Sequence, residues 1–460
     1  MDFDQIGLVR LIQSNATMLI PLSVLGMSGS IIKYYPAVKN DPSVKDAIIT
    51  LQILILVCSN FIILLISTIF YSEIASLFIE KSPAYVDYLT ITVLILVFQS
   101  TFEYLFSIAR SELDVIFPSF LKEVLLRGGN MVLVVSYGFN LINFTDFISV
   151  LALLYLVNTG IFLLFLFIKK KLRFNFKFNR LKGSLLKQVA NYSGYTLMLS
   201  IGVSIITNIS YVMTSSYLGL EANGIFTTCM FIGIIIEMPK RAMNLIVGPL
   251  ISNSFKKNNG KEIENIYQRA SLNLSIIGLL LTIGIITNIN DFFSIVPKGA
   301  QLADGLWVVI AVAISKLSAM FFGPSGELLM YSKLKNFMLY FMLTSAVLII
   351  LLNWLLIPIF GLNGAALAFL ITSLADQIFR FILIRSQMKI KLFIINHLKL
   401  FAIGGMTIWI FTMLPIPFTE FYAIPIRAVL TTVVFLGMVY TFSVSSEFNL
   451  TLKKLIHRFL

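Results

Sequence analysis

The chain consists of long, nearly uninterrupted apolar segments separated by short polar ones. Each apolar segment approaches the roughly 20 residues with which a helix crosses a bilayer. Strands of a membrane barrel would instead alternate apolar and polar residues over about ten positions. Since backbone groups inside lipid must bond to one another, unbroken apolar runs indicate helices. The pattern predicts an all-α, polytopic membrane protein of about thirteen spans, at 6–32, 47–70, 85–108, 117–139, 146–168, 189–216, 224–250, 272–288, 304–325, 336–357, 363–385, 398–414 and 425–443.

The composition favours a bilayer over water as the environment of these segments. Of the 460 residues, 58% are hydrophobic and 12% are charged, and the mean hydropathy is +0.91. Soluble domains carry about 25% charged residues, and a soluble core cannot hold such an apolar excess. Cys58 and Cys229 lie inside apolar segments. We expect them to act as small apolar residues without a disulfide or a metal centre, and we predict no cofactor.

The charge of the loops alternates in sign along the chain. Loops after the odd-numbered segments, and the C-terminal tail, are rich in Lys and Arg, whereas the other loops carry mainly acidic residues. This alternation accounts for the net charge of +13 without a nucleic-acid partner. Because basic loops stay in the cytoplasm, the pattern predicts a cytoplasmic C-terminus and, with an odd number of spans, an N-terminus on the outside.

The basic loop 169–187 is expected to divide the chain into two lobes. The predicted organisation is an N-terminal lobe in 1–168, a cytoplasmic linker in 169–187, a C-terminal lobe in 188–385, and two further spans with the tail in 386–460. Within the linker, Phe174, Phe176 and Phe178 alternate with basic or polar residues. Two interpretations stay open, which are contact with anionic lipid headgroups and a solvated linker.

Ionisable residues inside spans are costly and therefore mark candidate functional positions. Three pairs are spaced so that they share a helix face and can neutralise each other, namely Glu123/Arg127, Glu237/Arg241 and Asp376/Arg380. The remaining lysines have no partner on their own helix, which leaves a net positive interior suited to a phosphate or pyrophosphate group. The candidate substrate ligands are Arg127, Lys240, Arg241, Lys122, Lys316 and Arg380.

The position of each candidate in its segment decides how strongly it is favoured as a substrate ligand. Lys122 and Lys316 lie toward the cytoplasmic ends of their segments, where a long side chain can extend to the interface. Arg127, Lys240 and Arg241 are therefore the stronger candidates. Pro239 directly precedes Lys240 and interrupts the helix there, as either a passive kink or part of a functional site.

Signatures of catalysis are missing from the sequence. It contains no Walker A loop, no HExxH, no nucleophile elbow and no CxxC. The outward loops are short, which leaves little room for a catalytic domain outside the membrane. We therefore expect a transport protein and not an enzyme.

Three stretches resemble a known family. Asn353–Ala366, NWLLIPIFGLNGAA, is similar to a hairpin of the polysaccharide flippases, the O-antigen and teichoic-acid type of the multidrug/oligosaccharidyl-lipid/polysaccharide (MOP) exporter superfamily. Gly26–Pro36, GMSGSIIKYYP, resembles the end of that family's second span, and Leu218–Phe226, LGLEANGIF, resembles the turn between its seventh and eighth spans. The resemblance covers essentially the whole chain, and the order and spacing of the stretches carry it.

The resemblance implies a fold and a function. It implies a two-lobed fold, like that of the multidrug and toxin exporters (MATE), whose lobes rock around a central cavity. The implied activity is transfer of an undecaprenyl-pyrophosphate-linked oligosaccharide across the bacterial inner membrane for surface polysaccharide synthesis. Lys240 and Arg241 would lie near the cavity entrance. The implied partners are the lipid-linked oligosaccharide, membrane lipids, and a polysaccharide polymerase with its chain-length regulator.

The sequence also departs from the family pattern. The stretch from Gly7 falls where the family's second span begins, so the family's first helix is expected to be missing, through a truncated gene or in a viable thirteen-span form. Ser210 and Tyr211 stand where relatives often carry an acidic–basic pair, so ion coupling is not expected there. The alternative functions are a MATE-type cation or drug antiporter and a membrane-embedded polysaccharide polymerase or glycosyltransferase.

Overall fold

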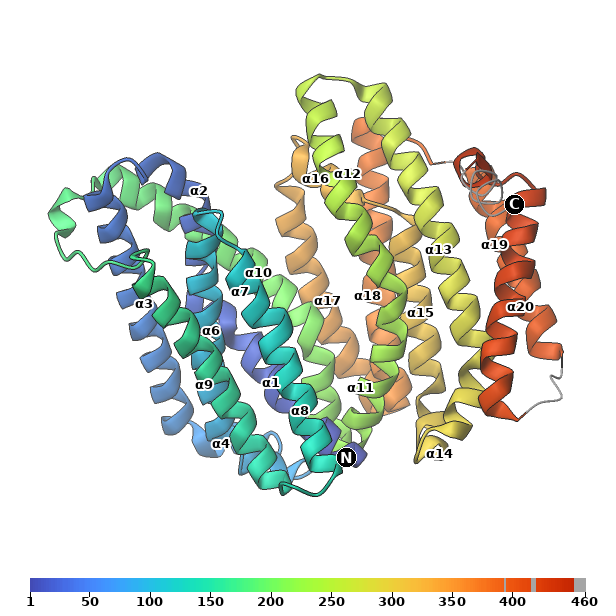
Figure 1. Cartoon of the computed structure of the whole chain (residues 1–460), viewed down its shortest axis with the longest axis horizontal. Coiled ribbons are helices and arrows are strands. Elements are labelled where there is room, and N and C mark those ends of the chain that lie inside the picture. The colour runs from blue at the N-terminus through green and yellow to red at the C-terminus, as the bar shows by residue number, and fades with distance from the viewer. Residues whose placement is uncertain (393, 415–418, 451–460) are drawn as a thin grey trace. The chain divides into compact units, whose positions relative to one another are not determined.

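The computed structural model describes residues 1–392, 394–414 and 419–450, and these residues form helices and connecting turns without a β-strand (Figure 1). The chain divides into two compact units, Met1–Gly224 and Ile225–Leu460. Each unit is described by itself below. The all-α membrane fold predicted from the apolar segments is confirmed.

Unit 1 consists of long helices with short ones at their ends. Three of its elements, α7, η1 and α8, join into one continuous helical stretch from Ile116 to Gly138. The elements of unit 1 are α1 (Phe3–Val24), α2 (Met27–Val38), α3 (Pro42–Ile69), α4 (Tyr71–Ser76), α5 (Pro83–Val86), α6 (Leu89–Ser111), α7 (Ile116–Phe120), the π-helical η1 (Leu121–Leu125), α8 (Leu126–Gly138), α9 (Phe144–Ile168), the 3₁₀ turn η2 (Phe178–Arg180) and α10 (Gly183–Leu218).

The first predicted span, 6–32, is broken. Leu25 and Gly26 adopt left-handed backbone angles, with φ of 51° and 69°, and α1 and α2 bend by 43° at this point. A Cβ on Gly26 would lie 2.0 Å from the carbonyl oxygen of Ser193, so only glycine lets α10 approach this closely. The apolar pattern could not reveal the bend, because the residues on both sides of it remain apolar.

Helix α10 packs with the N-terminal helices. The Ser204 hydroxyl donates to the Thr17 carbonyl in α1 at 3.0 Å, and the Thr196 hydroxyl donates to the Gly26 carbonyl at 2.7 Å. By its packing, α10 belongs to the compact unit Met1–Gly224. The sequence had assigned the residues of α10 to the C-terminal lobe, because they follow the basic linker 169–187. The division into lobes 1–168 and 188–385 remains a prediction of which segments move against each other during transport.

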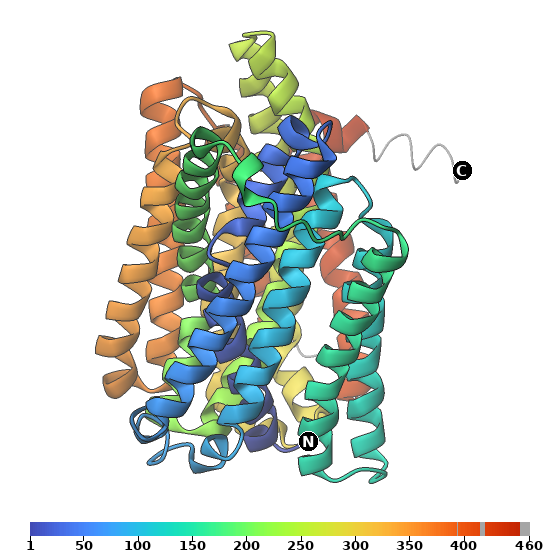
Figure 2. The same ribbon diagram turned by 90° about the vertical axis from the view of Figure 1, so that its left-hand side faces the viewer.

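The basic linker folds back onto the start of α3, as Figure 2 shows. The Asn175 backbone N–H donates to the Thr50 hydroxyl at 2.9 Å, and the Asn175 side chain donates to the Ser43 carbonyl at 3.0 Å. Leu172 and Leu181 are buried in the core of unit 1. The linker is therefore an ordered part of the unit.

Ionic and polar contacts join three loops at this end of unit 1. Glu112, at the end of α6, accepts a hydrogen bond of 3.0 Å from the Tyr35 hydroxyl, and its carboxylate lies 3.3 Å from Lys171 and 3.8 Å from Lys45. Lys171 also pairs with Asp114 at 2.5 Å. Burial alone would lower the pKa of Lys171, but the hydrogen bonds and charges of Asp114 and Glu112 outweigh burial and raise this pKa.

Unit 2 repeats the pattern of long helices. α13 is its longest helix among the described residues, and both α19 and α20 pack against α13. The elements are α11 (Leu220–Ile234), which begins in unit 1, the 3₁₀ turn η3 (Ile235–Glu237), α12 (Met238–Lys256), α13 (Gly260–Ile295), α14 (Gly299–Leu302), η4 (Ala303–Gly305), α15 (Leu306–Phe321), α16 (Ser325–Tyr331), α17 (Phe337–Phe360), α18 (Leu362–Leu383), η5 (Ile384–Met388), α19 (Ile394–Met413) and α20 (Glu420–Thr441).

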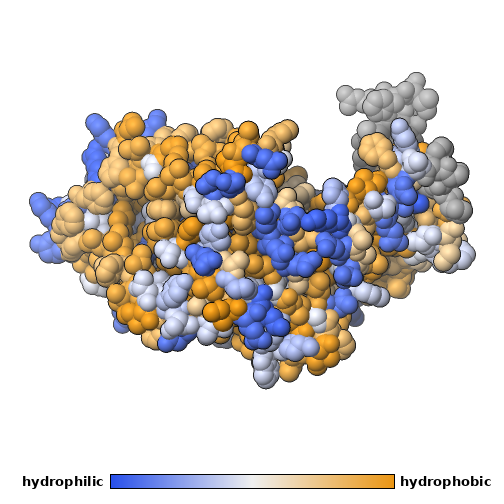
Figure 3. All heavy atoms as spheres, turned by 90° about the horizontal axis from the view of Figure 1, so that it is seen from below, coloured by the Kyte–Doolittle hydropathy of each residue, from blue (hydrophilic) through white to orange (hydrophobic). Residues whose placement is uncertain are grey.

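The described residues contain 11 helices long and apolar enough to cross a membrane, or 12 if the bent pair of α1 and α2 counts as one span. The remaining predicted span, 117–139, is helical from Ile116 to Gly138. It is not counted among these 11 helices because its three charged residues, Lys122, Glu123 and Arg127, make it less apolar than they are. Apolar side chains such as Phe61 and Ile62 of α3 are exposed, and hydrophobic residues cover much of the surface in Figure 3. This surface suits contact with lipid.

Replacement of the Glu112 carboxylate tests the contacts between the loops. Glu112→Gln should lower the free energy of unfolding by about 1–3 kcal/mol, because Lys45 and Lys171 lose their partly buried counter-charge. Thermal unfolding in detergent measures the change. Asp114→Asn is the matched control and should cost less, since Asp114 is 33% exposed against 12% for Glu112. Equal effects of the two variants would contradict this account.

Candidate functional site

Unit 2 contains an ion pair that joins two helical elements. The Lys316 ammonium of α15 lies 2.5 Å from the Glu237 carboxylate at the end of η3. The sequence predicted that Glu237 would instead pair with Arg241 one turn later. That pairing is wrong, because the tighter 3₁₀ turn at Ile235–Glu237 interrupts the regular helix on which the i,i+4 spacing depends. Arg241 is exposed.

The Asp376/Arg380 pair predicted from the sequence is confirmed. Arg380 Nε donates to one carboxylate oxygen of Asp376 at 3.0 Å, and a terminal nitrogen lies 2.9 Å from the other oxygen. This two-point contact lies within α18, and Arg380 is only 9% exposed. The guanidinium also borders α16, since a Cβ on Gly326 would lie 3.3 Å from it.

Lys240 is hydrogen-bonded to an uncharged group. Its ammonium donates to the Ala319 carbonyl near the end of α15 at 2.7 Å. The charges that act on it include two carboxylates, Glu237 and Glu327, and two cations, Lys316 and Arg380. Unit 2 therefore holds a mixed cluster of three cations, Lys240, Lys316 and Arg380, with three carboxylates, Glu237, Glu327 and Asp376. The interior is more nearly neutral here than the sequence suggested.

In unit 1, Lys122 and Arg127 face different surroundings. Arg127 pairs with Glu123 at 2.9 Å, as predicted, but its side chain is 73% exposed. Lys122 instead forms an ion pair with Glu103 of α6. The sequence could not reveal this partner, because the two residues lie on different helices. The sequence ranked Arg127 above Lys122 as a candidate substrate ligand. The structure favours the reverse order, because Lys122 lies in the interior and Arg127 on the surface.

Lys122 and Glu103 line a cavity of about 520 Å³ inside unit 1. Its walls come from α1, α2 and the break between them, and from α6, η1 and α10. Besides the ion pair, the lining is rich in hydroxyl and amide groups, from Thr17, Ser28, Gln99, Ser200, Ser204 and Thr207. Such a polar lining can bind a hydrated or charged group.

Arg10 in α1 is a basic residue that the sequence analysis did not single out. Its guanidinium carbon lies 3.9 Å from the ring centroid of Tyr211 in α10, which is a cation–π contact. Lys33 makes a similar contact with Tyr192, at 3.7 Å. Neither contact has a signal in the sequence, since the cation and the ring come from helices far apart along the chain.

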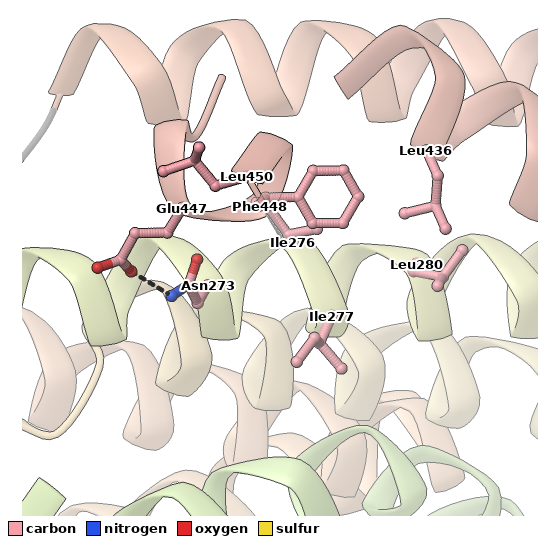
Figure 4. Close-up of a pocket in the computed structure, with 8 residues that line it drawn as sticks. All are labelled: Asn273, Ile276, Ile277, Leu280, Leu436, Glu447, Phe448 and Leu450. Atoms are coloured by element: carbon pink, nitrogen blue, oxygen red, sulfur yellow. Dashed lines mark hydrogen bonds between the residues drawn. The ribbon is translucent and has the colours of Figure 1, made fainter. Parts of the chain in front are cut away.

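A second cavity lies in unit 2 and is mainly apolar. It measures about 620 Å³ and runs along α13, with Ile276, Ile277 and Leu280 on one side and Leu436 of α20 on another (Figure 4). Among the described residues that line it, only Glu447 carries a charge; it accepts a hydrogen bond from Asn273 at 3.1 Å and pairs with Arg269. The described part of the lining therefore offers no cation to an anionic headgroup.

Comparison with known proteins shows the fold. No family model matches the sequence, and no curated protein does either. Among solved structures, the lipid II flippase MurJ in an inward closed conformation matches 96% of this chain and 97% of its own, with a TM-score of 0.73 and 15% identity. An inward-facing MATE family transporter matches 84% and 91%, with a TM-score of 0.67 and 15% identity.

A third similar structure comes from the same superfamily. It is a MOP superfamily transporter from Pyrococcus furiosus, 15% identical with a TM-score of 0.55, for which reverse polarity of the binding pocket suggests a different function. The chain therefore has the fold of a multi-pass membrane transporter. More particularly, this is the fold shared by MATE transporters and a lipid II flippase of the MOP superfamily.

The Lys316–Glu237 pair can be tested by a double-mutant cycle. Lys316→Met should lower the free energy of unfolding by about 2–3 kcal/mol, because Glu237 loses its partner in a partly buried site. Adding Glu237→Gln should restore most of that loss. Thermal unfolding in detergent measures each variant. Arg127→Gln, in the exposed pair, should cost less than about 0.5 kcal/mol. If the single and double variants were equally unstable, the pair would not be stabilising.

Proposed function

We propose that this protein is a flippase that moves an undecaprenyl-pyrophosphate-linked oligosaccharide across the bacterial inner membrane. The observation that carries the proposal is the extent of the likeness to the lipid II flippase, 96% of this chain against 84% for the MATE transporter. The uncovered 4% is shorter than α19 or α20 alone, with 20 and 22 residues, so the flippase match includes part of both helices.

The basic residues inside the helices fit the substrate. A pyrophosphate needs cationic donors in a place from which water is partly excluded. Lys240 and Arg241 at the start of α12 are the proposed entrance ligands, and Lys122 lines the cavity of unit 1. Lys316 and Arg380 each have a carboxylate partner within unit 2, so their proposed role is to tune the charge around the substrate. Arg127 is paired with Glu123 and exposed, so no substrate contact is proposed for it.

Alternating access is the proposed transport mechanism. The similar MATE structures include an inward-facing and an outward-facing conformation. We propose that this chain also changes between two such states. The loops 39–41, 112–115 and 169–182 lie together at one end of unit 1, where the strongly basic stretch 169–182 contacts the acidic residues of 112–115. The excess of Lys and Arg in 169–182 supports the orientation expected from the sequence, with the C-terminus in the cytoplasm.

A cation or drug antiporter is the second candidate. Such a protein is expected to use intramembrane carboxylates as cation sites. Here the carboxylates Glu103, Glu237 and Asp376 are each paired with a Lys or Arg of the same unit. This pairing leaves them less available to a cationic drug and favours the flippase.

Membrane lipids are the proposed partners of the linker. The stretch 169–187 holds eight Lys and Arg residues and no acidic residue. Its anchoring at Asn175 leaves Phe174 and Phe176 exposed, at 49% and 65%. Exposed aromatic rings among cations suit the anionic interface of a bilayer.

Complementation of a flippase-deficient strain tests the proposed function. The unchanged chain should restore surface polysaccharide. Lys240→Gln with Arg241→Gln should reduce export and leave lipid-linked units in the inner leaflet, because the entrance loses two cations. Lys256→Gln with Lys257→Gln is the matched control, since both residues are exposed at the end of α12. Normal export by the first variant, at normal protein level, would contradict the assigned role.

Fluorescence quenching tests the linker. With the three native tryptophans changed to Phe, a Trp at position 176 should be quenched by brominated phosphatidylglycerol in nanodiscs. A Trp at the exposed position 179 is the control and should be quenched less. Phosphatidylcholine should lower the quenching at 176, because it lacks the net negative charge that attracts the basic stretch. Stronger quenching of position 176 by aqueous iodide than by lipid would favour the solvated linker.

A further inference from the structure

The cavity of unit 1 has polar groups that the protein itself does not use. Among the described residues, no hydrogen bond engages the Gln99 amide or the hydroxyls of Ser28 and Ser200. All three line the cavity together with Lys122 and Glu103. Ser28 and Gln99 are part-exposed and Ser200 is exposed, so these groups are open to water or to a polar ligand that enters the cavity beside the ion pair.

The helix that carries Lys122 has an unusual backbone at this point. Leu121–Leu125 forms a π-helical turn between α7 and α8. Such turns are rare and often occur at functional sites. Lys122 pairs across to α6, whereas its neighbour Glu123 pairs with Arg127 on the exposed surface, so the two charges serve different sides of one helix.

The opposite wall is also irregular. The cavity is lined by Val24 and Gly26, on either side of Leu25, whose φ of 51° is uncommon for a residue with a side chain. Backbone held in sparsely populated conformations gathers at binding sites. Two independent irregularities, a π turn and a broken helix, therefore border the same cavity.

The Lys122–Glu103 ion pair is partly exposed to the cavity. The Lys122 side chain is 36% exposed and the Glu103 side chain is 30% exposed, so both can be reached from the cavity. A lone ammonium inside a membrane protein is costly, and a resident carboxylate removes that cost while the cavity holds no anion. An arriving phosphate oxygen could take the place of the carboxylate, because both are acceptors for the same ammonium.

We infer that Lys122 binds a phosphate or pyrophosphate group in this cavity and that Glu103 is a built-in competitor for the same ammonium. This inference rests on the proposed function and assigns one part of its substrate site. Competition has a use in transport, since a ligand that must displace Glu103 is bound less tightly and is released more readily. The hydroxyl and amide groups of Ser28, Gln99 and Ser200 would bind further oxygens of the ligand.

The inference predicts opposite effects for the two partners. With purified protein in nanodiscs, calorimetric titration with inorganic pyrophosphate should show binding to the unchanged chain. Glu103→Gln should tighten binding by about three- to fivefold, as expected when a part-exposed ion pair no longer has to be broken. Lys122→Gln should weaken it by about tenfold or more, because a charge-assisted hydrogen bond is lost. Glu123→Gln, on the exposed side of the same helix, is the matched control and should leave the affinity unchanged.

A purely structural pair would behave differently. Both single variants would then weaken binding alike, and the exchange Glu103→Lys with Lys122→Glu would restore it, which would overturn the inference. If Glu103→Gln does not fold, Glu103→Asp provides the test, since the shorter carboxylate competes less and should also tighten binding. Lys122→Arg keeps the charge and should retain binding.

Two further arms locate the source of the anion and separate this inference from the proposed function. Tighter binding of geranylgeranyl pyrophosphate than of inorganic pyrophosphate would indicate a lipid headgroup, and equal binding would indicate a free anion. Complementation by the unchanged chain tests the flippase role alone. Failed complementation with opposite effects of the two variants would overturn the flippase but keep the anion site. Successful complementation, with both variants weakening pyrophosphate binding equally, would support the flippase and overturn the anion site.

Discussion

A charge inside a bilayer must find its counter-charge or hydrogen-bond partner within the protein, because lipid offers neither. This requirement explains which contacts hold the helices together. Lys122 with Glu103 joins η1 to α6, and Lys316 with Glu237 joins α15 to η3. The groups that we propose as ligands of an anionic substrate therefore include groups that join helices to one another. At these positions the proposed binding role and the stability of the fold would depend on the same side chains.

The sequence was informative wherever neighbours along the chain decide the outcome. Apolar segment lengths predicted the helices, and the i,i+4 rule predicted the Asp376/Arg380 and Glu123/Arg127 contacts. It failed where the backbone leaves the regular helix, at Glu237 and at the bend of Leu25 and Gly26. It also could not find contacts between helices, since nothing near Lys122 in the sequence points to Glu103. The ordered path of the linker was hidden for the same reason, because its anchors, Ser43 and Thr50, belong to α3.

The fold narrows the function without selecting the substrate. The scaffold that this chain shares with the lipid II flippase also occurs in MATE transporters, and one similar structure was distinguished by the polarity of its pocket. What decides between lipid-linked anions and cationic drugs is the balance of charge that remains after the protein's own pairs are formed. In this chain Glu103, Glu237 and Asp376 are held in ion pairs, whereas Lys240 bonds to a carbonyl group with Glu327 among the charges that act on it. The described cluster of unit 2 is therefore balanced, and the exposed Arg241 adds a positive charge beside it.

The contacts of Lys171 have a consequence for how the protein is made. During synthesis, α3 and α6 are made before the linker, so in the proposed orientation the three lysines at 169–171 would be free to act as the signal that keeps the linker in the cytoplasm. Only afterwards can Lys171 meet Glu112 and Asp114, which cancel its charge. In that orientation the same side chain would serve first as a topological signal during insertion and later as an ion-pair partner of Glu112 and Asp114. A substitution at Lys171 could then misdirect newly made chains as well as loosen the finished protein.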